Sequence, residues 1–174
     1  MAIDYSKPGY KEMFANYGLT ALAAQAIEKS LLLLLSAVEC LEVGKVSKRD
    51  LHNVFEKHDR KTLGQLITAL RKKVAFPQPL EDNLCLALEK RNYVMHDFFL
   101  NRFDITRLQG SPEKMSEELR PIRDLFHDVQ ERTDTILETM QKKFGVSAAK
   151  LDQQARQLLK SYQSSNKGAE RDGP

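Results

Sequence analysis

Apolar residues recur three or four positions apart along most of the chain, with polar residues between them. This spacing brings apolar side chains to one face of an α-helix, whereas a half-buried strand would show them at every second position. The sequence contains no convincing alternating segment or hairpin signal. The pattern therefore predicts an all-α fold, an antiparallel bundle of four or five main helices.

The helix boundaries carry recognisable signals. Thr62 and Gln65 fit a capping box, and Pro79 suits a first helical position. Pro121 is expected to bend the helix that contains it or to mark its start. The predicted helices span roughly residues 19–42, 47–58, 62–73, 80–101, 111–144 and 147–162.

The first predicted helix contains the run LLLLL at residues 31–35. Charged residues flank this run, and the apolar stretch is shorter than the roughly 20 residues that cross a bilayer. We therefore expect a core helix and no membrane segment. The N-terminus also lacks the charged-then-apolar order of a secretory signal, which predicts a cytoplasmic protein. The inward face of this helix is predicted to contain Leu22, Ala26, Leu33, Ala37 and Cys40 or Leu41.

Composition limits the alternatives further. The chain has 174 residues and a net charge of +3, which is compatible with a polyanionic partner but too small to indicate one. Cys40 and Cys85 lie in apolar helical patterns and are predicted to be buried thiols, and no Cys/His spacing indicates a metal site. The expected organisation is an N-terminal extension (1–15), a helical domain (16–145), a C-terminal helix (146–163) and a disordered tail (164–174).

Residues 89–99, EKRNYVMHDFF, place an arginine where the helical pattern calls for an apolar residue. Arg91 projects from the middle of the apolar face, and Asn92 and His96 lie in one row along its flank. A guanidinium is costly to bury alone, so Arg91 needs a carboxylate, a water-filled crevice or a bound anion. The apolar face itself is predicted to contain Leu80, Leu84, Leu88, Met95 and Phe98.

A purely structural interpretation of these three residues stays open. Arg91 can pair with a carboxylate of another helix, Asn92 can bond a backbone carbonyl, and His96 can be a boundary histidine with its hydrogen bonds satisfied. The other histidines, His52, His58 and His127, show no spacing typical of a catalytic triad or a metal site and are predicted to lie at the surface or in the core.

The segment RNYVMH at residues 91–96 resembles the motif of the HEPN superfamily, in which an arginine and a neighbouring polar residue precede a histidine by four to six intervening residues. The resemblance extends more loosely over residues 15–145, including AIEKSLLLL of the first helix. It implies a HEPN-like helical bundle with metal-independent ribonuclease activity and no cofactor. It also implies a homodimer that joins two motifs in one cleft, a role in toxin or phage-defence systems, and an antitoxin or other operon partner.

The residue types suit that chemistry. An imidazole such as that of His96 can act as a general acid or base, Arg91 can hold the scissile phosphate, and Asn92 can orient either group. Three nearby residues are predicted to contact RNA, although a solvated helix face explains the basic ones equally well. These residues are Lys90, Tyr93 and Arg102.

Three functions follow from these observations. The leading prediction is an endoribonuclease that cleaves RNA by attack of the ribose 2'-hydroxyl. The second is a catalytically silent module of the same fold that binds RNA or a nucleotide through Arg91. The third is a helical adaptor in which Arg91 is a structural ion-pair partner.

Overall fold

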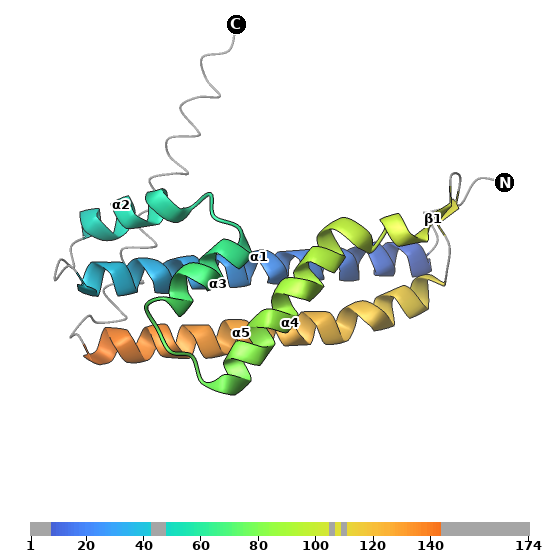
Figure 1. Ribbon diagram of the computed structural model, residues 1–174. Helices are drawn as coiled ribbons and strands as arrows, with labels where there is room; N and C mark the ends of the chain where they lie inside the picture. The colour runs from blue at the N-terminus through green and yellow to red at the C-terminus, as the bar shows by residue number, and fades with distance from the viewer. Residues whose placement is uncertain (1–7, 43–47, 105–106, 109–110, 144–174) are drawn as a thin grey trace, which may run out of the picture. The chain divides into compact units, whose positions relative to one another are not determined.

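A computed structural model of the chain describes residues 8–42, 48–104, 107–108 and 111–143 (Figure 1). The predicted all-α fold is confirmed. The predicted C-terminal helix at 146–163, the tail at 164–174 and the cap at Ser47 lie outside the described residues. The α-helices are α1 (Pro8–Glu42), α2 (Lys48–His58), α3 (Leu63–Arg71), α4 (Gln78–Asn92) and α5 (Pro112–Lys143).

Shorter elements connect α4 to α5. A π-helical turn, η1 (Tyr93–Asp97), continues α4 directly, and a 3₁₀ turn, η2 (Leu100–Arg102), follows. Two-residue strands, β1 (Phe103–Asp104) and β2 (Arg107–Leu108), pair antiparallel. Pairs this short show no alternation in sequence, so the pattern did not predict them.

The chain divides into two compact units, Met1–Asp134 and Thr135–Pro174. In the second unit, residues 135–143 are helical as the end of α5. In the first unit, contacts define the directions of three helices. Gly9 of α1 lies near Pro112, and Asn16 accepts a hydrogen bond from Arg123 Nη1 at 3.0 Å, so α1 and α5 run in the same direction.

Helix α4 runs opposite to both α1 and α5. Tyr17 of α1 contacts Val94, whereas the later Glu28 contacts the earlier Arg91. Asn83 likewise bonds Asp128 of α5 at 2.9 Å. The shared direction of α1 and of the part of α5 in the first unit departs from a purely antiparallel bundle.

Helix α1 begins at Pro8, although the pattern predicted a start near residue 19. Met13 is fully buried, so residues 8–15 of the predicted extension are helical and contribute to the core. The predicted inward face is wrong for Leu22 and Leu33, which are 62% and 38% exposed. The buried positions are Met13, Thr20, Ala23, Ala24, Ile27, Ser30, Leu31, Leu32, Leu34, Leu35, Ser36, Val38 and Cys40.

The physical reason for this error is that leucines surround α1 while small and hydroxyl residues share its core face. The Thr20 hydroxyl donates to the Asn16 carbonyl and the Ser36 hydroxyl to the Leu32 carbonyl, each at 2.8 Å. A hydroxyl bonded to the preceding turn of its own helix can be buried without an unpaired polar group. A polar residue type therefore did not identify the solvent-facing positions of α1.

Helix α1 is long and apolar enough to cross a membrane by length and composition, and 56% of its most apolar 18-residue window is buried inside the protein. A core helix of a soluble protein passes the same test, so this property does not distinguish the two environments.

The predicted starts of three helices are close to the observed ones. Thr62 and Gln65 form the expected capping box before α3, with backbone-to-side-chain distances of 3.0 and 3.4 Å. Pro79 lies in the first turn of α4, and α5 begins at Pro112 and continues through Pro121 without ending there. Cys85 is exposed, which contradicts the prediction of a buried thiol, whereas Cys40 is buried as predicted.

Candidate functional site

Arg91, predicted to project from the apolar face of its helix, lies on the side of α4 that contacts α1. Its Nε donates to Glu28 Oε1 of α1 at 3.0 Å, and both belong to the first unit. The two side chains keep 22% and 27% of their surface exposed, so this ion pair lies at the edge of the core and remains open to water. A carboxylate of another helix therefore contacts Arg91, and solvent reaches it as well.

The π-turn η1 brings His96 beside Arg91. In a regular α-helix, residues five apart point about 140° away from each other. In η1 the Phe98 amide instead donates to the Tyr93 carbonyl, five residues back, at 2.8 Å. Residues five apart then become neighbours on one face, and Arg91 Nη1 lies 3.5 Å from His96 Nε2. Short π-turns inside α-helices occur frequently at functional sites.

The same turn changes which residues are buried. Val94 and Phe98 are buried, whereas Met95, predicted to lie on the apolar face, is exposed. The Tyr17 hydroxyl of α1 donates to the Val94 carbonyl at 3.2 Å, and the Tyr17 ring lies 5.6 Å from the Phe98 ring. Contacts from α1 thus support the turn that positions His96.

The residue types of Arg91, Asn92 and His96 determine which of their atoms donate and which accept hydrogen bonds. Arginine nitrogens only donate, so Asn92 Oδ1 accepts from Arg91 Nη1 at 3.4 Å. A hydrogen bond from Nη1 to His96 Nε2 requires a lone pair on Nε2, that is, a neutral ring with its proton on Nδ1. Among the described residues Arg91 Nη2 has no hydrogen-bond partner, so two of its donors can contact a ligand.

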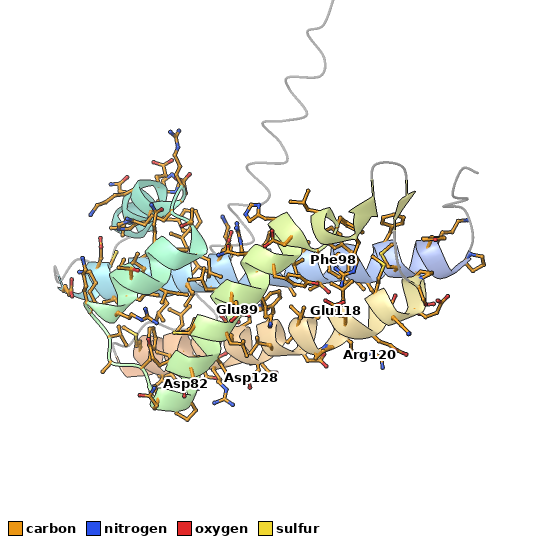
Figure 2. All side chains as sticks on the ribbon, turned by 45° about the vertical axis from the view of Figure 1, so that its right-hand side comes forward. Asp82, Glu89, Phe98, Glu118, Arg120 and Asp128 are labelled. Carbon is orange, nitrogen blue, oxygen red and sulfur yellow. The ribbon has the colours of Figure 1, made fainter. Side chains whose placement is uncertain are left out.

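Tyr93 and Arg102, predicted to contact RNA, form a separate network on the α5 side. Arg102 Nη1 donates to the Tyr93 hydroxyl at 2.9 Å, and both residues contact the Glu118 carboxylate. The Arg102 guanidinium also lies 4.5 Å from the centre of the Phe98 ring. Figure 2 shows Glu118 on α5 beside Phe98. The structure therefore does not bring these two residues together with Arg91 and His96.

The contacts within this network shift the pKa values of Tyr93 and Arg102. Burial raises the pKa of Tyr93, and its hydrogen bond to Glu118 raises that pKa further. Burial lowers the pKa of Arg102, but the bond to Tyr93 and the charge of Glu118 outweigh this effect, so its pKa lies above the ordinary value. Tyr93 therefore stays protonated and Arg102 charged at neutral pH, as a structural network requires.

Lys90, the third predicted RNA contact, pairs with its neighbour Glu89 at 3.0 Å. Both line a shallow groove of about 320 Å³ between the end of α4 and α5. Its other lining residues are Tyr93, Glu118, Pro121 and Ile122. Arg91, Asn92 and His96 do not line this groove, so the groove is not part of the site that these three residues form.

Replacing Arg102 with alanine is expected to lower the free energy of unfolding by about 1–2 kcal/mol, because Tyr93, Glu118 and the Phe98 carbonyl lose a charged partner that is only partly screened by water. Chemical denaturation measures this loss. RNA affinity should be unchanged. Weaker RNA binding at unaltered stability would instead make Arg102 a phosphate contact.

Sequence reasoning missed Glu28 as a site residue. The available signal was an acidic side chain close to the leucine run at residues 31–35, together with an arginine on the apolar face of another helix. Pattern alone cannot assign the pair, because the chain has 24 acidic residues and the two positions are far apart in sequence.

The remaining histidines take surface or core positions, as predicted. His58 is buried, with Nε2 3.1 Å from Glu39 Oε1, an ion-pair distance without the alignment of a hydrogen bond. His52 pairs with Glu56 one turn later on α2, and His127 is exposed on α5. In the parts of the chain that the structure describes, no three His, Cys, Asp or Glu side chains are grouped as metal ligands would be.

Comparison of this chain with known protein families, with curated proteins and with solved structures finds no match. A functional assignment therefore rests on the geometry around Arg91, which contacts Glu28, Asn92 and His96.

Proposed function

We propose that this protein is a metal-independent endoribonuclease of the HEPN type that acts in the cytoplasm. One observation carries the proposal: the π-turn places the His96 imidazole 3.5 Å from the Arg91 guanidinium, at a partly exposed edge of the core. An ionisable ring can transfer the protons of ribose phosphodiester cleavage, and a permanent cation beside it can stabilise the charge that develops on the phosphate. Asn92 contacts the same guanidinium and can orient it.

The proposed reaction uses the ribose 2'-hydroxyl as nucleophile. His96 Nε2 takes the hydroxyl proton, the 2'-oxygen bonds to phosphorus, and the bond from phosphorus to the 5'-oxygen breaks. A protonated imidazole returns a proton to that leaving oxygen. Arg91 Nη2 binds the non-bridging oxygens, on which negative charge is concentrated during the transfer. The products are a 2',3'-cyclic phosphate and a 5'-hydroxyl.

The two proton transfers favour a homodimer, because the motif supplies one histidine per chain and a symmetric pair supplies two. Exposed apolar side chains on α1, and Met95 next to His96, offer a surface for a second copy. Light scattering that showed only the 19.9 kDa monomer would remove this part of the proposal. The exposed large apolar residues of this part of the chain include Leu19, Leu22, Leu33, Met95 and Leu100.

The cellular role that fits is that of a toxin or phage-defence effector. A nuclease with little sequence selectivity harms its own cell, so a second gene product, such as an antitoxin or another operon partner, would hold it inactive. Co-expression tests this role: growth arrest by the wild-type chain, absent with His96→Ala, supports it, and unimpaired growth with active soluble protein contradicts it.

The Glu28–Arg91 ion pair favours a second candidate, a helical adaptor in which Glu28 already compensates the charge of Arg91. The partial exposure of both side chains and the unused donors of Arg91 Nη2 weigh toward ligand contact.

Incubation of the purified chain with single-stranded RNA in EDTA tests the proposal. We expect cleavage of the RNA and none of the same sequence carrying 2'-O-methyl groups, because the methyl group removes the nucleophile. Cleavage of both substrates would exclude the 2'-hydroxyl route. Salt-dependent binding of both without cleavage would identify the silent module.

A further inference from the structure

Glu28 is the one carboxylate that contacts Arg91 among the described residues, and it reaches Arg91 from α1 across the helix interface. The contact is made to Nε at 3.0 Å, at the base of the guanidinium. Nη1 points instead toward Asn92 and His96. The charged group is thus held at one end while its outer nitrogens stay with the imidazole.

We infer that Glu28 is a positioning residue, which fixes the guanidinium plane of Arg91 so that Nη1 stays beside His96 and Nη2 faces the phosphate. This inference rests on the proposed function. An arginine side chain has several rotatable bonds, and a bond at Nε removes much of the freedom of its planar head. Placement within a fraction of an ångström is what such a site needs, because a small displacement of a catalytic group costs rate.

A purely stabilising role accounts poorly for this ion pair. Both side chains keep about a quarter of their surface in water, so solvent screening reduces the contribution of this pair to stability. Glu28 also compensates the charge of Arg91 when no phosphate is bound, which makes an arginine tolerable on the apolar face of α4. The carboxylate can hold Nε whether or not a phosphate is present, because the phosphate would bind Nη2.

Glu28 should influence kcat only by positioning Arg91, and a double-mutant cycle tests this dependence. Glu28→Ala is expected to lower kcat about tenfold to 100-fold, with KM nearly unchanged. Glu28→Gln keeps an oxygen that accepts from Nε and should recover most of the lost rate. In an Arg91→Ala background, Glu28→Ala should lower kcat no further.

Glu39→Ala is the matched control. Glu39 also lies on α1 and also pairs with a neighbouring helix, through Lys57 and His58 of α2, but it does not touch Arg91. Its removal should affect thermal stability and leave kcat unchanged, with all rates normalised to folded protein.

The possible outcomes distinguish a failure of the proposed nuclease function from a failure of the positioning role alone. A wild-type chain that leaves RNA intact overturns the nuclease and the role of Glu28 together. Cleavage by the wild type with an unaffected kcat in Glu28→Ala overturns only the positioning role. Independent, multiplying losses in the double mutant would also overturn it, since Glu28 would then act on the substrate directly.

Discussion

His96→Ala is expected to reduce RNA cleavage by about 100-fold to 10,000-fold, the usual contribution of a general acid or base. The loss should appear in kcat, because the imidazole transfers a proton in the transition state and contributes little to ground-state binding. Single-turnover cleavage of a labelled RNA measures it. Stability should hardly change, since His96 is exposed.

The matched control is His127→Ala, which removes another exposed histidine, on α5. It should cleave RNA at the wild-type rate and so exclude a general effect of losing surface imidazoles. Full activity in His96→Ala would reject the catalytic assignment of this residue, whatever the behaviour of the control.

Arg91→Ala is expected to lower cleavage by about 100-fold to 1,000-fold, as loss of one donor to developing negative charge does. It should also weaken RNA binding and reduce the slope of log affinity against log salt by about one unit, because one phosphate contact is lost. Arg91→Lys should recover binding better than rate, since an ammonium keeps the charge but lacks the planar fork. Titrations at several salt concentrations, with cleavage assays, measure both effects.

Arg120→Ala provides the comparison, because Arg120 is an exposed arginine on α5 (Figure 2). It should leave the cleavage rate unchanged. The adaptor interpretation predicts a different result for Arg91→Ala: lower stability, from a carboxylate at Glu28 left without its partner, and no change in RNA binding.

Local signals in the sequence predicted much of the fold. The capping box at Thr62 and the proline at position 79 depend on residues within one turn, and both are found where expected. The inward face of α1 was not predictable from its pattern, because leucines cover several sides of the helix. Leu22 and Leu33 accordingly proved exposed, while Thr20 and Ser36 are buried with their hydroxyls bonded locally.

The candidate site was likewise predictable only where the signal was local in sequence. Arg91 was recognisable as a misplaced charge, since its neighbours on α4 define the apolar face. The π-turn was not, because an amide that bonds five residues back leaves no periodic signal. The helical pattern predicted Asn92 and His96 in one row that converges with Arg91 at one edge of the apolar face, but not the direct contact between Arg91 Nη1 and His96 Nε2. Glu28 required tertiary contacts, as did the Glu118 carboxylate that engages Arg102.

The termini of the cleaved RNA test the central claim, that Arg91 and His96 together act on a ribose phosphodiester, most directly. Mass spectrometry of the products formed in EDTA should find 2',3'-cyclic phosphates and 5'-hydroxyls. Products with 3'-hydroxyls and 5'-phosphates, or intact RNA, would contradict it.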